Sequence, residues 1–218
     1  GKTLVYFKRI KDLIDKGFQA LILLPEIALT NQFSRRFKEF FGAEPAIWHS
    51  GTTKKNKTII WKGVTEGKIK IVIGARSSLF LPFKNLGIIV VDEEHDVSYK
   101  QDEGVSYNAR DMAITRASLE NIPINLVTSI PSIETYNNIV NKKYCITKLE
   151  KRYKEASLPT IEIINLHSEL LDKNTWIANK TINKVNQYLD KGDQVLFFLN
   201  RRGYAPFVTC KKCGYRFQ

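Results

Sequence analysis

The chain has 218 residues, of which 43% are hydrophobic, so it can bury the core of one large domain or of one domain and part of a second. Its 34 Lys and Arg against 22 Asp and Glu give a formal charge of +12. That balance favours a nucleic-acid partner, although a basic solvated surface would also produce it. No apolar run approaches the roughly 20 residues that span a bilayer, and no signal peptide opens the chain. We therefore expect a cytoplasmic protein without a membrane partner.

Strand and helix patterns alternate through the first part of the chain. Short apolar runs predict strands over 19–25, 45–50, 68–74, 86–91 and 124–129. Apolar residues at helical spacing predict helices over 4–14, a Phe-rich segment ending at Gly42, 54–66, 108–120 and a segment with Pro131 in its first turn. Gly17 is the expected stop of the first helix, and Asn108 is the expected cap of the fourth. The alternation predicts an α/β fold, with a mainly parallel sheet covered by helices on both faces.

The pattern changes near residue 150. Residues 1–149 form the first expected domain, and the polar stretch 150–160 is predicted to be a linker. A strand over 160–166, a helix over about 175–190 and a strand over 194–200 indicate the start of a second domain, residues 161–209.

An acidic cluster follows the apolar strand in "LGIIVVDEEHD", residues 86–96. In a parallel sheet flanked by helices, the functional crevice lies at the carboxyl ends of the strands. Asp92 could there hold Mg²⁺, a hard ion that prefers oxygen ligands and keeps much of its water. Glu93 could orient or deprotonate an attacking water. The alternative is a solvated acidic turn.

The first three residues, "GKT", match the end of a phosphate-binding loop. In such a loop Lys2 reaches the β and γ phosphates and Thr3 binds Mg²⁺. The triplet is short enough to occur by chance, but here it opens the first helix, ahead of the strand that ends in the acidic cluster. ATP-driven motors have the same order of phosphate loop and acidic strand.

Several longer segments together resemble the bacterial primosomal replication-restart DNA helicases. They are "GKTLVY", "LLPEIALT", "HSG", "IVIGARSSLFLPFKNLGIIVVDEEHDVSYKQDEGVSYNARD", "PSIET" and "FLNRRGYAP" followed by "CKKCG". The resemblance covers essentially the whole chain and is most specific over 72–111 and 194–214. It implies a superfamily 2 helicase with a RecA-like P-loop NTPase lobe and the start of a second lobe. It also implies ATP and Mg²⁺ as cofactors, single-stranded and forked DNA as partners with the primosome and single-strand-binding proteins, and a place at the bacterial nucleoid.

The resemblance also assigns residues to the ATP site. Gly1, Lys2 and Thr3 correspond to the end of the ATP loop. Asp92 and Glu93 correspond to the Mg²⁺-binding and water-activating pair. His95 occupies the position that senses the nucleotide state.

Candidate DNA-binding residues follow from the same resemblance, which places Thr30 and Arg76 on the DNA-facing side. The segment from Ser98 to Arg110 resembles an aromatic-rich loop that links DNA binding to ATP hydrolysis. In it, Tyr99 and Tyr107 could stack on unpaired bases, with Lys100 and Arg110 near the backbone. The alternative is that both tyrosines cover the edge of the sheet.

The three cysteines are too few for a disulfide framework. Cys145 is expected to be a small buried hydrophobe. Cys210 and Cys213 resemble the first half of the family's zinc-binding insertion, which would begin over residues 210–218. Structural zinc takes four ligands, so such a site would continue beyond Gln218. A redox role for the C-x-x-C lacks a thioredoxin-like context.

The sequence departs from the family pattern in two respects. One concerns the segment that couples ATP hydrolysis to strand movement, and the other concerns the parts that complete the ATP site. Ile130 replaces a Thr in the segment thought to couple hydrolysis to strand movement. The phosphate loop begins here at its last Gly, and the chain stops before the part of the second lobe that would supply an arginine finger. We therefore expect a fragment. The first hypothesis is the ATP-hydrolysing lobe of a helicase, the second is a non-catalytic nucleic-acid-binding remnant, and the third is another translocase, such as a restriction-enzyme motor subunit.

Overall fold

The computed structural model describes residues 1–25, 31–150, 159–166, 177–198, 208–209, 212–213 and 216–217. The chain divides into two units, residues 1–157 and 158–218, and each is described by itself.

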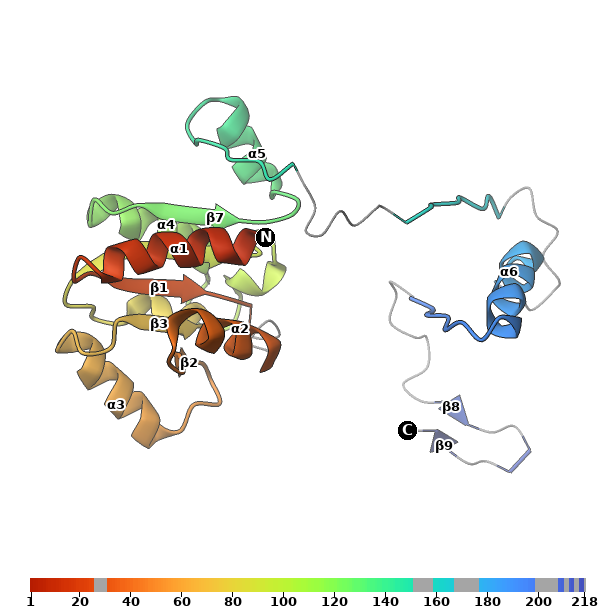
Figure 1. Ribbon diagram of the computed structural model, residues 1–218, viewed down its shortest axis with the longest axis horizontal. Helices are drawn as coiled ribbons and strands as arrows, with labels where there is room; N and C mark the ends of the chain where they lie inside the picture. Colours follow the sequence, from red (N-terminus) through yellow and green to blue (C-terminus); the bar gives the residue numbers. More distant parts are fainter. Residues whose placement is uncertain are drawn as a thin grey trace. The chain divides into compact units, whose positions relative to one another are not determined.

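A parallel sheet forms the centre of the first unit (Figure 1). Its strands are β1 (Gln19–Leu23), β2 (Ala46–Trp48), β3 (Ile71–Gly74), β4 (Leu86–Asp92) and β7 (Ile124–Val127), in the order β2-β3-β1-β4-β7. All four pairings are parallel, so every strand ends at the same edge of the sheet. Strands β1 and β4 are buried along their whole length, as expected for the middle of a sheet covered on both faces.

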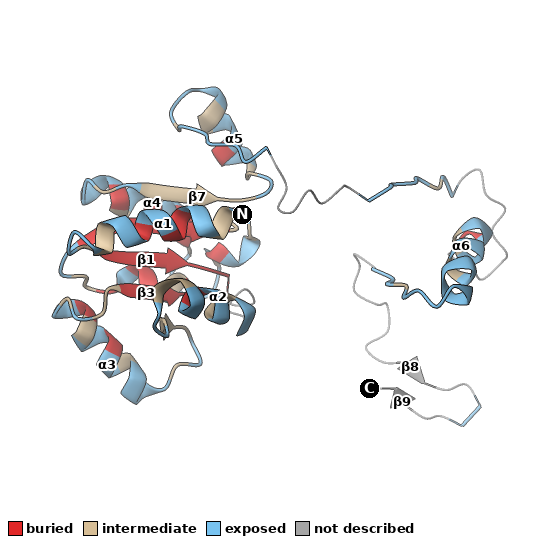
Figure 2. Cartoon of the chain, viewed as in Figure 1, coloured by how far each residue is buried: buried red, intermediate tan, exposed pale blue. Residues whose placement is uncertain are grey.

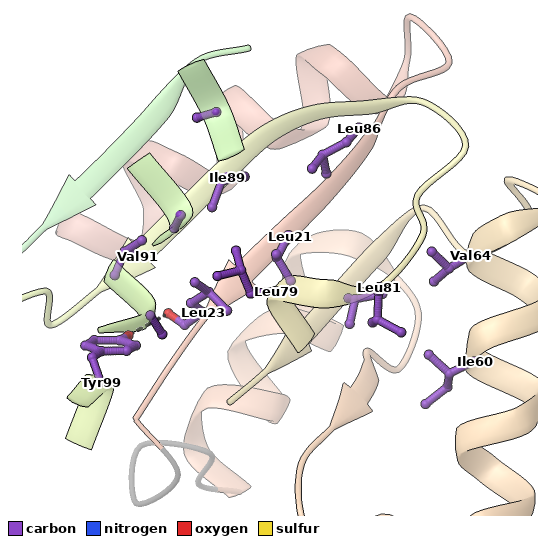
Figure 3. Packing of buried hydrophobic residues seen from close by; sticks show 14 residues of the cluster. Leu21, Leu23, Ile60, Val64, Leu79, Leu81, Leu86, Ile89, Val91 and Tyr99 are labelled. Carbon is purple, nitrogen blue, oxygen red and sulfur yellow. Dashed lines mark hydrogen bonds between the residues drawn. The ribbon is translucent and has the colours of Figure 1, made fainter. Parts of the chain in front are cut away.

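Four helices of this unit cover both faces of the sheet. They are α1 (Lys2–Ile14), α2 (Asn31–Phe41), α3 (Lys54–Thr65) and α4 (Ala109–Leu119). A fifth helix, α5 (Ile133–Val140), follows the edge strand β7. Because successive residues of a strand point to opposite faces, β1 serves two cores. Ala20 and Ile22 pack with α1 and α2. Leu21 and Leu23 pack with α3 and α4 on the other face (Figure 3). Buried residues accordingly concentrate on the strands and on the inner sides of the helices (Figure 2).

Short elements connect the layers around the carboxyl edge of the sheet. Two 3-10 helices, η2 (Arg76–Phe80) and η3 (Val97–Tyr99), follow β3 and β4. Strands β5 (Lys100–Gln101) and β6 (Tyr107–Asn108) form a small antiparallel hairpin that leads into α4.

The predicted helix boundaries agree closely with the structure in the first unit. Gly17 has a φ of +89°, which suits glycine and ends the segment after α1. Asn108 caps α4, because its side chain accepts a hydrogen bond from the Arg110 N–H. Pro131 lies just before α5 rather than in its first turn, because Ser132 is the cap.

The second unit departs more from the prediction. It contains α6 (Asn179–Asp190) and a two-stranded sheet of β8 (Val208–Thr209) and β9 (Arg216–Phe217). The expected strands over 160–166 and 194–200 are not seen in their described parts, 160–166 and 194–198. An apolar run supplies strand propensity only, and without a hydrogen-bonded neighbour it forms no ladder. Among the described residues, no helix is long and apolar enough to cross a membrane.

Candidate functional site

The two predicted halves of the ATP site meet at the carboxyl edge of the sheet. Lys2 is the first residue of α1, and Glu93 directly follows β4. The Lys2 Nζ donates a hydrogen bond to Glu93 Oε1 at 3.1 Å, and their side chains are 33% and 37% exposed. Residues 91 positions apart are therefore brought together at an accessible place.

Asp92 lies deeper than Glu93 and is almost fully enclosed, with 7% of its surface exposed. The Tyr6 hydroxyl donates to Asp92 Oδ2 at 2.9 Å, and the Glu93 N–H donates to Oδ1 at 3.1 Å. Burial raises the pKa of Asp92, although both of these hydrogen bonds oppose the rise. Burial, together with the nearby Asp92 carboxylate, also raises the pKa of Tyr6, so its hydroxyl remains a donor.

The backbone of Glu93 has a φ of +48°, in the left-handed region that non-glycine residues rarely occupy. Such a conformation costs of the order of 1–3 kcal/mol and persists only where the surroundings enforce it. Here the Glu93 carbonyl accepts from the Asp96 N–H at 2.8 Å and the Glu94 N–H donates to the Val127 carbonyl at 3.1 Å. The turn is thus fixed to β7 with the Glu93 side chain directed toward Lys2.

His95 reaches the segment that follows β7. Its Nδ1 lies 2.7 Å from Thr128 Oγ1 and 3.7 Å from Glu93 Oε2. The Thr128 hydroxyl has one hydrogen, which it donates to the Ile130 carbonyl at 2.6 Å, so the His95 Nδ1 is the donor in their contact. Ile130 is 74% exposed. The hydroxyl that contacts the acidic turn therefore belongs to Thr128, and the residue at position 130 takes no part in that contact.

The donor set at this edge fits Mg²⁺ together with a phosphate. Gly1 precedes α1 as its N-cap, and the half-buried Thr3 shares a side-chain hydrogen bond with Tyr6, which contacts Asp92. A hydroxyl, an amine and two carboxylates therefore lie near one another. Mg²⁺ characteristically takes one or two carboxylates and completes its shell with water and substrate phosphates. Among the described residues, no group of three or more His, Cys, Asp or Glu is placed to hold a metal ion.

Some predicted DNA-binding residues are accessible on or near η2. The Arg76 Nη1 donates to the Lys100 carbonyl at 2.7 Å, which joins η2 to the β5–β6 hairpin. The Lys100 side chain is exposed and pairs with Asp102 at 3.1 Å. The half-buried Tyr107 ring lies 5.6 Å from that of Phe80, which is 55% exposed and was not predicted. Thr30 lies outside the described residues.

Tyr99 and Arg110 are placed differently from the prediction. Tyr99 is 1% exposed, and its hydroxyl shares its one hydrogen between the backbone carbonyls of Asp92 and Leu23, at 2.6 and 3.0 Å. Its ring therefore offers no face to a base in this structure. Arg110 is 6% exposed, and its guanidinium is held by acidic side chains that include Glu94. The polar groups of both residues are hydrogen-bonded within the protein, so these residues support the site internally and offer no surface to DNA.

Glu94 and Tyr6 are site residues that sequence reasoning missed. Glu94 stood in the acidic cluster without a role, yet it is 1% exposed and accepts several hydrogen bonds. The sequence feature that could have identified Glu94 is its position shortly after a buried strand, where a charged residue is unusual. Tyr6 stood on the apolar side of the first helix, and nothing in the spacing distinguished its hydroxyl from a core residue.

The cysteines give little support to the metal prediction. Cys213 is exposed, and Cys210 lies outside the described residues. Cys145 is also exposed, so its expected burial is wrong. Cys145 follows α5 in the chain, where the sheet no longer buries the side chains.

The parallel sheet and its two helical layers form an α/β lobe that carries the Lys2–Glu93 pair at its carboxyl edge. Residues 1–139 match the family model of DEAD/DEAH box helicases, and the chain belongs to that family. Membership of a helicase family implies ATP and Mg²⁺ as cofactors.

The relatives are replication restart proteins. The chain is 55% identical over 216 residues to replication restart protein PriA of Rickettsia conorii, covering 99% of this chain and 33% of that protein. It is 38% identical to PriA of Bacillus subtilis, covering 99% of this chain and 27% of that protein. The chain thus spans about a third of the length of the first of these relatives. The resemblance seen in the sequence is confirmed, which disfavours a restriction-enzyme motor subunit.

Two solved structures have a partial likeness to this chain. RecG bound to a three-way DNA junction is 26% identical, with a TM-score of 0.45, covering 63% of this chain and 18% of that chain. The DEAD-box helicase Mss116 bound to single-stranded RNA is 19% identical, with a TM-score of 0.45, covering 69% of this chain and 30% of that chain.

Proposed function

We propose that this chain is the ATP-hydrolysing lobe of a DNA helicase that acts in replication restart and couples hydrolysis to translocation on single-stranded DNA. The observation that carries the proposal is the meeting of Lys2 and Glu93, at 3.1 Å, beside the buried Asp92 carboxylate. The names of the relatives support replication restart as the process.

The roles of the side chains follow from their chemistry. The Lys2 amine would hold the β and γ phosphates, next to the N-terminus of α1 at Gly1. Thr3 and Asp92 would hold Mg²⁺, whose positive charge neutralises the phosphate oxygens. Glu93 would orient or deprotonate the attacking water, since it is the more exposed of the two carboxylates.

The Lys2–Glu93 ion pair would reorganise when a nucleotide binds. Each side chain is about one-third exposed, so their attraction is screened by solvent and contributes little stability. A phosphate would compete with Glu93 for the Lys2 amine. Glu93 would then be free to accept a proton from water.

The DNA side of the lobe would lie around η2 and the β5–β6 hairpin. Arg76 and Lys100 would contact phosphates, and the Tyr107–Phe80 pair would offer an aromatic surface to bases. Thr30 keeps its proposed phosphate contact by resemblance. Forked DNA, primosome proteins and single-strand-binding proteins are the proposed partners of the whole protein, and His95 would report the nucleotide state to Thr128.

A zinc ion is proposed at Cys210 and Cys213, because the C-x-x-C spacing suits half of a four-ligand site. Cys213→Ser should lower the zinc content of the protein, measured by atomic absorption. Cys145→Ser is the matched control, since Cys145 is also exposed. Equal zinc contents in the two variants would contradict the assignment.

A non-catalytic nucleic-acid-binding remnant is the second candidate. The loss of a hydroxyl at Ile130 favours it, whereas the net charge of +12 fits both candidates. The two candidates differ in turnover, not in DNA binding.

The test uses a hybrid protein in which this chain replaces the aligned third of the Rickettsia conorii protein. The helicase proposal expects ATP hydrolysis that single-stranded DNA stimulates. Salt-dependent DNA binding without ATP hydrolysis would instead establish the remnant. The unmodified relative serves as the positive control for the assay.

A further inference from the structure

Glu94 lies within the acidic turn but faces away from the proposed ATP site. Its neighbours Glu93 and His95 have side chains 37% and 42% exposed, whereas the Glu94 side chain is 0% exposed. No step of the proposed hydrolysis uses it. A fully enclosed carboxylate in this position therefore needs another explanation.

Four donors satisfy the Glu94 carboxylate. The Ser132 N–H donates to Oε1 at 2.8 Å. Oε2 accepts from the Ser132 hydroxyl at 3.0 Å, from the Thr135 hydroxyl at 3.0 Å and from Arg110 Nη1 at 3.3 Å. Arg110 also donates to Ser132 Oγ at 2.7 Å, so the side chains form a closed cluster.

This cluster joins three segments that are separate in the chain. Glu94 belongs to the turn after β4. Ser132 caps α5 and Thr135 lies in its first turn, and Arg110 lies in the first turn of α4, just after the β5–β6 hairpin. The segment 128–132 is thereby held to the acidic turn at both ends. His95 contacts Thr128 at one end, and Glu94 binds Ser132 at the other.

A buried cluster of charged side chains usually stabilises a fold no more than apolar side chains would. Apolar side chains of similar volume are often as stable or more so, and removing one partner leaves an uncompensated charge. Such a cluster instead fixes one discrete arrangement of its segments. Movement of the acidic turn must then move the start of α5 and Arg110 together, or break the cluster.

We propose that Glu94 is a positioning residue that transmits the state of the acidic turn to the segment 128–132 and, through Arg110, to the β5–β6 hairpin. The proposal rests on the proposed function, because the acidic turn contains Glu93 and the hairpin lies beside the proposed DNA contacts.

The first experiment needs no catalytic activity. Amide hydrogen exchange of the 218-residue chain is compared for wild type, Glu94→Gln and Glu134→Gln. Glutamate 134 is the matched control, since it also lies near Arg110, at 3.6 Å, but its side chain is 70% exposed. Glu94→Gln should speed exchange in peptides covering 128–135 and 107–112 about tenfold, as expected for a lost hydrogen bond to a charged group. Glu134→Gln should change it about twofold or less.

The second experiment measures the ratio of DNA-stimulated to basal ATP hydrolysis in the hybrid protein at saturating ATP. Glu94→Gln should lower this ratio about 5-fold or more, the lower end of a typical coupling between sites. The DNA concentration for half-stimulation should change less than the ratio. A simple loss of folded protein would lower both rates equally and leave the ratio unchanged.

The outcomes separate the two proposals. Unchanged exchange in both segments, or an unchanged ratio, overturns the role of Glu94. A wild-type hybrid without hydrolysis overturns the proposed function and with it the transmitting role, while the exchange data still decide whether Glu94 holds the segments together. If Glu94→Gln does not fold, the buried Thr135 is replaced instead. Thr135→Val removes one hydrogen-bond donor to Glu94, so it should change the exchange rates and the ratio in the same directions by smaller amounts.

Discussion

At the scale of single residues, Asp92 is held by two tyrosine hydroxyls that act on different groups. Tyr6 donates to its carboxylate at 2.9 Å, whereas Tyr99 donates to its backbone carbonyl at 2.6 Å. Both tyrosines are 1% exposed, so removal of either hydroxyl leaves a comparable buried ring. Only the Tyr6 bond depends on the charge of Asp92.

The sign of the pH dependence follows from the pKa of Asp92. Burial raises this pKa above its ordinary value, so the folded chain keeps the proton to higher pH than the unfolded chain. The contribution of that shift favours folding at low pH and is lost as pH rises through the folded pKa. The Tyr6 hydrogen bond lowers the pKa, so its own contribution is full above the folded pKa and declines as pH falls through it.

We therefore predict that Tyr6→Phe lowers the free energy of unfolding by about 2 kcal/mol at pH 7, the typical value for a hydrogen bond to a charged group. The loss should shrink as pH falls through the raised pKa of Asp92 and its carboxylate becomes protonated. Urea unfolding at a series of pH values measures both quantities. Tyr99→Phe should cost about 1 kcal/mol at every pH, since its acceptors are neutral carbonyls. A Tyr6→Phe loss that does not vary with pH would contradict this account of Asp92.

At the scale of elements, α1 is held to the sheet and to α2 by an aromatic cluster. Phe7 is 0% exposed, and its ring centroid lies between 5.1 and 5.8 Å from four phenylalanine rings of α2. These rings fix the helix whose first residue is Lys2. The position of the Lys2 amine thus depends on apolar packing about one and a half turns away.

We predict that Phe7→Ala lowers the free energy of unfolding by about 3–5 kcal/mol, because it leaves a cavity among the α2 rings. The matched control is Leu4→Ala on the same helix, where the side chain is 53% exposed and the cost should stay near 0.5 kcal/mol. Both values come from urea unfolding with unchanged m-values. Equal losses in the two variants would show that the cluster does not anchor α1.

The strands and helix caps of the first unit could be predicted because their signals are local. The apolar run before Asp92 forms β4, and Asn108 caps α4 as its side-chain chemistry suggests. The strand expected over 160–166 did not form in the structure, since apolar content cannot supply a partner strand.

The candidate site was predictable only in part. Lys2 and Glu93 carry motif signals and do meet. The burial of Tyr99 and Arg110 depends on tertiary contacts, which no spacing along the chain reveals. The role of Glu94 likewise depends on α5, which begins nearly 40 residues later, with its Ser132 contact separated by 38 positions.

At the scale of the whole molecule, the charge of +12 predicts DNA binding that weakens steeply with salt, because bound phosphates release counterions. Arg76→Ala should reduce the slope of log K against log salt by about 1 if Arg76 contacts a phosphate. Lys8 is exposed on α1, on the opposite face of the sheet from η2, so Lys8→Ala should leave the slope unchanged. Fluorescence anisotropy with labelled single-stranded DNA gives both slopes. Equal slopes in the two variants would remove Arg76 from the proposed DNA side.

The most direct measurement of the central claim is ATP turnover by the hybrid protein carrying Glu93→Gln. Since Glu93 is assigned to the attacking water, turnover should fall by about 10²–10⁴-fold while binding of a fluorescent ATP analogue is retained. Glu39→Gln, an exposed substitution on α2, on the opposite face of the sheet from η2, should keep wild-type turnover. Turnover by Glu93→Gln equal to that of Glu39→Gln would contradict the assignment of the Lys2–Glu93 pair as the ATP site.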